Sequence, residues 1–483
     1  MDTLAPRVGA RHIAATSVAP AVLSPRAGST PIEVAVRRNA LLIALLLCAP
    51  VAIRAQQEQG LRSKVSQLFI FGSGSDPLFL AGSGDPNNPA SLRAHGAHFI
   101  PSANAQNGSL IGFIIDAIGG SVANVPIGAT SGSETFQFVN GVPVRTSTSA
   151  GPIFAERAQT MGRGRSLVGI GRSGFNFKSL RGVPMDNVQL SFTHENVDFD
   201  GCDATVNGAD CGLMGVPERE NDVINLSLNL DLSIEVTTLY ATYGLFDKVD
   251  VGVVLPLVNT RLRGKSAAQI VPFGGTTAAH YFGGTPENPV LQASRDVEGS
   301  AFGIGDVALR TKILLRESPG ASLAILADAR FPTGDDADLL GAGNFAARGL
   351  AILSGRVGNI APHANVGYLY RAGAAENDAV LATGGFDNEI AHGVTLAVDL
   401  VSELQVGHSK LTLPAPVEIE SPFRRTITPT TIPDIRDDIV SGSFGFKFTT
   451  SKSITIVTNA LVPLNSGGLR SNLILTEAIE YIF

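Results

Sequence analysis

The sequence has 483 residues, of which 43 are acidic and 36 basic, so that the formal charge is −7. Charged residues make up only 16% of the chain, Gly occupies 53 positions and Trp is absent. This balance speaks against a nucleic-acid-binding protein, which would cluster Lys and Arg. A Gly-rich, charge-poor chain also suits strands and turns better than a helical enzyme.

An apolar run from Asn39 to Ile53 follows Arg37 and Arg38 and precedes the small residue Ala55. A basic start, a short apolar core and a small residue at the cut are typical of a secretion signal. The run is shorter than the roughly 20 residues of a membrane-spanning helix; a short buried helix is the alternative. We expect residues 1–55 to be a start codon assigned too early plus a signal peptide.

The next stretch, residues 56–160, shows no sustained alternation. Gly, Ser, Asp, Asn and Pro gather at 72–76 and 82–89, which is loop chemistry. Leu110–Ile118 is compatible with a short helix that Gly119 would end. We therefore predict an irregular N-terminal extension or a plug of the following domain, with a poorly ordered tail as the alternative.

From residue 161 onward apolar and polar side chains alternate, and a period of two indicates β-strands. One predicted strand has its apolar face at Leu226, Leu228, Leu230, Leu232, Ile234 and Val236, and its polar face at Asn225, Ser227, Asn229, Asp231, Ser233 and Glu235. About 13 strands are predicted in all. The others include segments near 186–197, 249–263, 303–315, 321–331, 346–356, 362–371, 378–386, 394–406, 443–449, 453–462 and 472–483.

The predicted connections alternate in length. Short turns are expected at 244–248, 317–320, 358–361 and 450–452, and long Gly-, Pro- and Asp-rich connections near 198–221, 264–299, 332–345 and 408–435. Transmembrane barrels carry short turns on one rim and long loops on the other. Residues 161–483 are therefore predicted to form an all-β, antiparallel transmembrane barrel of about 12–14 strands in the bacterial outer membrane. A secreted β-sandwich or propeller is the alternative.

Bacterial single-chain barrels have even strand numbers, so that one strand has been missed or counted in excess. Residues 135–147 are the candidate for a missed strand.

Two cysteines, Cys202 and Cys211, lie in a polar loop between two predicted strands. In an oxidising compartment such a close pair predicts a disulfide. Two free thiols are the alternative, and zinc is disfavoured because no second pair of ligands follows.

The sequence carries little catalytic chemistry. Gly169–Gly174 matches the dinucleotide glycine pattern, but Phe175–Lys178 continues as a strand instead of a helix, so NAD is rejected. No nucleophile elbow, zincin His pair or phosphate loop occurs, and we expect no catalytic residue, metal or cofactor. His363 and His408 are expected to line a pore or a rim. The acidic segment 333–338 is expected to be a solvated rim loop and not a cation site.

Charged residues recur on one face of the later strands. A lipid-facing charge costs roughly 2–4 kcal/mol at mid-membrane, so these residues should point into a lumen. There they would line a channel or pair within a packed polar interior. The candidates are Asp306, Arg310, Lys312, Asp328, Arg330, Arg348, Arg371, Asp399, Glu403 and Lys447.

The last predicted strand places Tyr481 and Phe483 on its apolar face. A Tyr-x-Phe ending resembles the assembly signal of bacterial outer-membrane barrels. This resemblance implies the barrel-assembly machinery as a partner, besides outer-membrane lipid and lipopolysaccharide.

Four segments, Tyr243–Gly252, Gly303–Lys312, Ala329–Asp335 and Leu340–Gly343, resemble one family. In it, a Gly-x-Gly-Asp strand precedes a loop that begins Pro-Thr-Gly-Asp. These are the outer-membrane channels associated with the meta pathway of phenol degradation, distant relatives of the long-chain fatty-acid transporter. The resemblance covers roughly 165–483 and implies passive uptake of small organic or apolar solutes. The alternatives are a barrel enzyme of the lipase or protease type and a non-conducting structural or adhesin barrel.

Overall fold

The computed structural model describes the second half of the chain almost completely and short pieces of the first. The described residues are 60–71, 81–82, 112, 114–116, 136–139, 142–145, 150–192, 222–272, 280–285, 287–318, 320–373, 376–410, 413–419, 424–450 and 453–483. The predicted signal segment 1–55 and the predicted disulfide Cys202–Cys211 lie outside these residues. No helix in the described part is long and apolar enough to cross a membrane.

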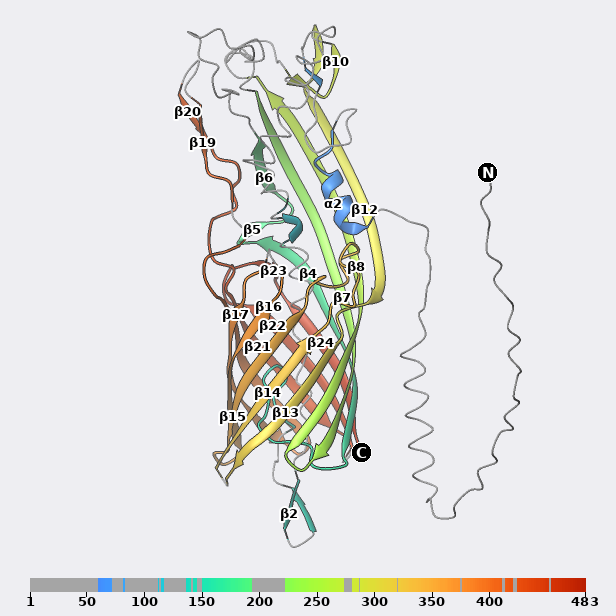
Figure 1. The fold of residues 1–483 in the computed structure, drawn as a ribbon, viewed down its shortest axis with the longest axis vertical. Coiled ribbons are helices and arrows are strands. Elements are labelled where there is room, and N and C mark those ends of the chain that lie inside the picture. Colours follow the sequence, from blue (N-terminus) through green and yellow to red (C-terminus); the bar gives the residue numbers. More distant parts are fainter. Residues whose placement is uncertain are drawn as a thin grey trace, which may run out of the picture. The chain divides into compact units, whose positions relative to one another are not determined.

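The described strands form a closed antiparallel barrel of 12 strands (Figure 1). They are β4 (Ser166–Leu180), β7 (Val223–Phe246), β8 (Val249–Val271), β13 (Ala308–Glu317), β14 (Ala321–Arg330), β15 (Ala346–Gly355), β16 (Ile360–Arg371), β17 (Ala379–Ala391), β18 (Val394–Gln405), β21 (Ile439–Thr449), β22 (Ile454–Pro463) and β24 (Ile474–Ile482). Closure comes from β4, which pairs with β24 on one side and with β7 on the other. The predicted fold class is confirmed.

The two rims differ as the sequence predicted. Short connections at 247–248, 318–320, 356–359, 392–393 and 450–453 form what we call the short-turn rim. The opposite, long-loop rim carries the connections 181–222, 272–307, 331–345, 372–378, 406–438 and 464–473. The backbone of Ser166 pairs with that of Phe483, so that the barrel sheet begins and ends at the short-turn rim.

Two sequence predictions about strands were wrong. Residues 135–147 are not a barrel strand: β2 (Phe136–Val139) and β3 (Val142–Arg145) pair only with each other. The segment near 186–197 supplied the excess strand, because β6 (Val188–Phe192) pairs with β7 beyond the point where β4 leaves it. Alternation alone could not separate barrel strands from these.

The predicted loop 264–299 is largely strand. β8 continues to Val271, and β12 (Gln292–Ile304) runs back along it in register. The remaining short elements are α2 (Leu61–Gln67), β1 (Ala81–Gly82), β5 (Val183–Pro184), β9 (His280–Tyr281), β10 (Gly283–Thr285), β11 (Asn288–Val290), β19 (Val417–Ile419), β20 (Arg425–Ile427) and β23 (Leu469–Ser471).

A sheet of long strands projects past the long-loop rim, as Figure 1 shows for β7, β8 and β12. We call it the blade: β6, β12, and the portions 223–236 of β7 and 257–271 of β8. At about 3.3 Å per residue the blade part of β7 is roughly 45 Å long.

The polarity of both faces inverts where the blade meets the barrel. From Ile224 to Thr242 the even-numbered side chains of β7 point inward; they are apolar up to Val236, and Thr242 follows nearer the short-turn rim. From Asn225 onward the odd-numbered side chains point outward; they are polar through Thr237 and apolar from Leu239 to Leu245. The inward face of the blade is thus a protein core, and its outward face meets water.

The outward apolar band below this inversion is the belt. Exposed Leu, Ile, Val and aromatic side chains cover it on every side, among them Ile170, Val253, Ile325, Leu353, Val366, Leu400, Phe444 and Ile456. A stable soluble monomer would not expose so large an apolar surface to water, whereas lipid covers such a surface without cost. A closed barrel with this exterior and asymmetric rims belongs in the bacterial outer membrane.

Candidate functional site

A segment of the N-terminal part, Ala150–Met161, lies inside the barrel; we call it the tongue. It forms no strand, yet most of its residues are buried. At its ends, Ala150 N donates to Thr395 Oγ1 (2.8 Å) and Met161 N donates to both carboxylate oxygens of Asp250 (3.0 Å). Thr395 and Asp250 are each the second residue of a strand that starts at the short-turn rim, so that the tongue enters and leaves there.

The middle of the tongue contacts residues deeper in the lumen. Glu156 Oε1 accepts a hydrogen bond from Arg310 Nη1 (3.1 Å), and Arg157 pairs with Asp387 of β17. All of these side chains are less than 10% exposed. The tongue therefore brings one acid and one base into a charged lumen, and each finds an opposite charge on the wall.

Two lysines of the wall hold the tongue backbone. Lys312 Nζ donates to Arg157 O, and Lys447 Nζ donates to Ala150 O, both at 3.3 Å. Lys312 Nζ also lies 3.8 Å from Asp250 Oδ2, one of the acceptors of Met161 N. Charge-assisted hydrogen bonds of this kind are roughly twice as strong as neutral ones.

His363 of β16 lies between two carboxylates that also grip the tongue. Its Nε2 lies 2.6 Å from Asp399 Oδ1, and its Nδ1 lies 3.5 Å from Asp387 Oδ1. Asp387 binds Arg157, and Asp399 Oδ2 accepts the Phe154 N–H at 3.5 Å. His363 therefore links the two carboxylates that hold the tongue, Asp387 on β17 and Asp399 on β18.

A second charged group lies nearer the long-loop rim. Asp328 pairs with Arg310 (3.4 Å) and with Arg348, and its charge and that of Arg330 interact. Arg310 thus links this group to Glu156 of the tongue. Further along, Arg371 pairs with Glu403.

Of the ten predicted lumen residues, Asp306 occupies the least expected place. Its charge and that of Arg330 interact, but its carboxylate accepts the Gly334 N–H (3.0 Å) and the Ala342 N–H (2.8 Å) from the β14–β15 connection. A side chain on Gly341 would come within 2.4 Å of Asp306 Oδ1. The Gly-x-Gly-Asp, Pro-Thr-Gly-Asp and Leu-Gly-Ala-Gly motifs thus meet in one loop anchor.

The same anchor lies at a break in a strand. Ile304, the last residue of β12, pairs with Leu257, and Ala308, the first of β13, pairs with Val254 on the same strand β8. Between them, Thr333 Oγ1 accepts from Val307 N (3.0 Å) and donates to Gly305 O (2.7 Å). The Pro-Thr-Gly-Asp loop supplies the hydrogen bonds that the ladder lacks there.

The tongue joins β4 through two glycines in the left-handed region, Gly162 (φ 82°) and Gly164 (φ 79°). Gly164 N donates to Gly244 O at 2.8 Å. A Cβ on Gly244 would lie 1.8 Å from Gly162 O, so that only glycine permits this approach.

The blade also encloses an N-terminal segment. Leu61, Val65, Leu68, Phe69 and Phe71 are buried against the inward face of the blade. Rings of this segment pack against Phe192 (centroids 6.3 Å apart) and Phe282 (5.2 Å). The acidic loop, predicted to be solvated, meets α2: Leu61 N and Arg62 N donate to Asp338 Oδ1 (3.3 Å) and Ala337 O (2.9 Å).

Sequence reasoning missed the tongue residues Glu156 and Arg157, and their partner Asp387. The one available signal was an acid and a base side by side in an otherwise small, apolar stretch. His363, expected at the pore or rim, faces the lumen, whereas His408 lies exposed at the long-loop rim.

At the last strand Tyr481 and Phe483 point outward and stack, with centroids 5.6 Å apart. This exposed pair is compatible with recognition by another protein, but the assembly role stays a prediction.

Solved outer-membrane structures are similar to this chain at low identity. The COG4313 outer membrane channel from Pseudomonas putida F1 is 11% identical, with 68% of this chain and 98% of that chain covered and a TM-score of 0.38. A Pseudomonas aeruginosa FadL homologue is 11% identical over 68% and 91% of the two chains, with a TM-score of 0.29. The P. putida toluene transporter TodX is 10% identical over 66% and 89%, with a TM-score of 0.26.

No curated protein matches the chain. A family model does: residues 221–413 match the family described as "Putative MetA-pathway of phenol degradation". This match spans all four motif segments from which the resemblance was predicted. The chain thus resembles, from β7 to β18, the channel family of the meta pathway of phenol degradation.

Proposed function

We propose that this protein is a passive outer-membrane channel for small organic, largely apolar solutes, and that the tongue is its plug. The observation that carries the proposal is that Ala150–Met161 occupies the lumen without pairing to any strand. A wall strand cannot leave a barrel without opening the sheet, whereas a segment held by side chains can. Glycines 162 and 164 supply the bend about which it would move.

The class of solute follows from the blade. Its inward face is apolar from Ile224 to Val236, and it leads to the long-loop end of the lumen. The segment 61–71 covers this face, so an apolar solute would gain free energy by leaving water for it only where that segment moves aside. The description of the matched family names phenol degradation. From it we propose only the class of solute for this chain, small organic molecules.

We propose passive movement, since the sequence contains no phosphate-binding loop. The tongue would be displaced by thermal motion or by solute, and neither route requires an energy source.

We also propose that the barrel is not an enzyme. Nucleophilic catalysis needs a His within reach of a Ser, Thr or Cys. Both contacts of His363 described above are with carboxylates, and His392 lies in an exposed two-residue turn. If replacing His363, His392 or His408 abolished a hydrolytic activity of the purified protein, this proposal would be wrong.

Single-channel conductance in planar bilayers tests the channel. We would compare the refolded chain 56–483 with a chain that starts at Gly162, which lacks the tongue and also the blade segment 61–71. We expect rare openings of the longer chain and sustained openings of the shorter one. The heat-modifiable gel band of a folded barrel serves as the control for both.

Two results would change the conclusion. Silence of both folded chains would contradict the open-channel proposal and favour a structural barrel. Equal, sustained conductance of both chains would leave the channel standing but show that the tongue is no plug.

A further inference from the structure

The outward face of the blade carries an unusually dense set of charges. We define the blade face by the outward side chains of β7, β8 and β12 above the inversion, with the end of β4 beside them. Its bases are Arg172, Lys178, Arg261, Arg263 and Lys265, and its acids are Asp231, Glu235, Asp296 and Glu298. Three of the bases form a row along β8, the other two lie on β4, and the acids flank the β8 row on β7 and β12.

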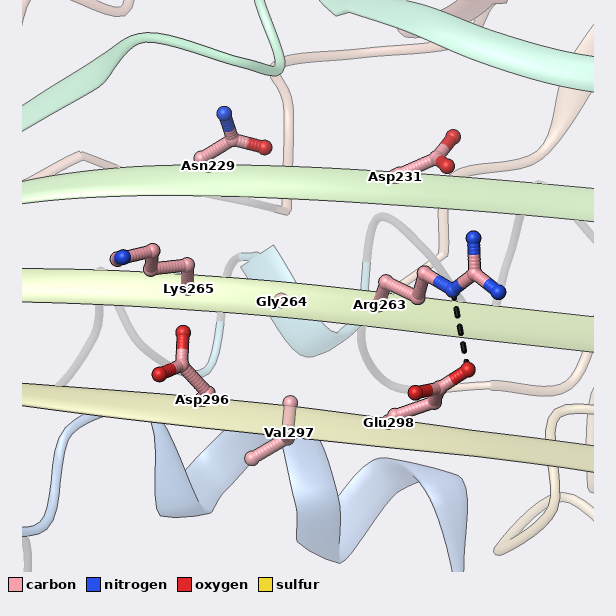
Figure 2. A pocket seen from close by; sticks show the side chains of 8 residues that line it. All are labelled: Asn229, Asp231, Arg263, Gly264, Lys265, Asp296, Val297 and Glu298. Atoms are coloured by element: carbon pink, nitrogen blue, oxygen red, sulfur yellow. Dashed lines mark hydrogen bonds and ion pairs between the residues drawn. The ribbon is translucent and has the colours of Figure 1, made fainter.

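An open pocket of about 440 Å³ lies in the centre of this face. Figure 2 shows its side chains on three neighbouring strands, with Arg263 Nε bound to Glu298 Oε1 at 3.0 Å. Lys265 stands opposite Asp296 in the strand register, and Arg263 opposite Asp231. Yet within the described part of the chain Arg261, Lys265, Asp231 and Asp296 form no side-chain hydrogen bond or ion pair. Both signs of charge are therefore available to a ligand.

The blade face begins directly above the lipid-covered belt. The outward side chains change from apolar to polar between Ile170 and Arg172 on β4, and between Leu239 and Thr237 on β7. On β12 the change comes between Phe302, which is 72% exposed, and Ser300. β4 pairs with β7, and β8 lies between β7 and β12, so that the inversion forms one continuous line. Arg172 and Glu235, paired at 2.9 Å, lie just above it.

We propose that the blade face binds the phosphorylated sugar headgroup of lipopolysaccharide in the outer leaflet. Arg261, Arg263 and Lys265 would bind its phosphates, and Asp231 and Asp296 would bind the divalent cations that bridge them. Arg and Lys recognise phosphate through charge-assisted hydrogen bonds, and carboxylates are ligands of Mg²⁺ and Ca²⁺.

Position and charge both select this occupant. Whatever covers the belt has its headgroup at the inversion line, and the β7 strand continues from there for a length of roughly 45 Å. A protein partner would require an apolar centre with few charges, whereas the centre of this face carries Asp231, Arg263, Lys265, Asp296 and Glu298 among polar side chains. A neutral phospholipid headgroup would leave the carboxylates without the bridging cations.

Binding of purified lipopolysaccharide to the refolded chain 56–483 in phosphatidylcholine vesicles tests the proposal, with Mg²⁺ present. The variant is Arg261→Glu with Lys265→Glu. The matched control is Lys248→Glu with Arg316→Glu, which makes the same charge change at exposed positions of the short-turn rim. We expect the blade variant to bind at least about tenfold more weakly and the control to bind like the wild type. Removing the phosphates from the lipopolysaccharide should weaken wild-type binding to a similar degree.

Equal affinity of the blade variant and the control would overturn the proposal, as would undiminished binding of the dephosphorylated lipid. If the blade variant lost the heat-modifiable band, Arg261→Gln with Lys265→Gln would replace it and be judged by the same criterion. This test does not measure conductance, so its outcome is independent of the proposed channel function.

Discussion

The N-terminal part of the chain fills the protein in two places by different means. In the blade, the segment 61–71 is held mainly by apolar side chains such as Leu68 and Phe69, both fully buried. In the lumen, the tongue is held by buried ion pairs and by hydrogen bonds to Asp250, Asp387 and Asp399. Each filling matches the inward face that it meets, and those faces have opposite polarity although β7 and β8 contribute to both.

This difference shows how the two regions can serve different ends. Apolar burial is non-directional and grows with area, so the blade core should be stable and unspecific in geometry. Buried ion pairs contribute little net stability, but breaking one partner is costly. The tongue is thus held in one well-defined position and can be released by a small change, as a plug requires.

The largest effect is expected from Asp387→Asn in the lumen. The change removes the negative charge beside Arg157 and His363, all of which are buried. Docking of the tongue should lose about 3–5 kcal/mol, the cost of leaving a buried charge without its partner. Open probability in planar bilayers should rise toward that of the chain that starts at Gly162.

Asp247→Asn, at an exposed position of the β7–β8 turn, is the control and should gate like the wild type. If Asp387→Asn stayed closed while its tongue remained docked, the ion pairs would not hold the plug.

Leu68→Ala in the blade should come next. Leu68 is fully buried in the blade core, and such truncations cost about 2–5 kcal/mol. Protease sensitivity of the segment 61–71 under increasing urea should report this loss. Leu239→Ala, on the lipid-facing belt, creates no cavity in the protein and serves as the matched control.

The conductance of Leu68→Ala should not change, because the blade core and the tongue share none of the contacts described above. Sustained opening of Leu68→Ala would show that the blade segment 61–71 and the tongue are coupled and do not act independently.

The sequence was sufficient for the barrel and insufficient for the blade. Period-two alternation and the alternating lengths of connections depend on local chemistry, and both predicted the barrel, although the connection 264–299 is largely strand. The alternation of Leu226 to Val236 is the same whether lipid or a protein core covers its apolar face. The sequence does contain the signal that separates a lipid-covered face from a protein core. On β7 the odd-numbered positions change from Ser233 and Glu235 to Leu239 and Tyr243 without a shift of register.

The conformation of the tongue and the position of Asp306 could not be predicted from the sequence pattern. The tongue has no period, since its conformation is set by partners more than 80 positions away such as Asp250 and Asp387. Asp306 shares the parity of Arg310, but the strand is interrupted between Ile304 and Ala308, so that parity across the break carries no information.

Ile325→Arg, set against Ser233→Arg, tests where the belt ends. Ile325 lies midway along β14 and is 43% exposed, whereas Ser233 points outward from the blade. A lipid-facing Arg at mid-membrane costs about 2–4 kcal/mol, and an exposed substitution in water changes stability by only about 0.5 kcal/mol. Urea midpoints of folding into vesicles should differ accordingly. Equal midpoints would mean that both faces meet the same medium.

The smallest effect is expected at the junction of the two regions, in the β18–β21 connection. Burial by itself would raise the pKa of Asp438, but hydrogen bonds from Arg436 and the Gln405 N–H, with the charge of Arg436, lower it overall. A lowered folded pKa contributes stability above the unfolded value of about 3.9, and this contribution is lost as pH falls through the folded pKa. Hydrogen-exchange protection of the Gln405 amide should therefore fall by roughly threefold between pH 5 and pH 2.5, a modest effect because the pair is partly exposed. Asp438→Asn should abolish this pH dependence. If this protection still fell in full in Asp438→Asn, the loss would come from the buried carboxylates of the lumen. The tongue, and not the long-loop rim, would then be the acid-sensitive part.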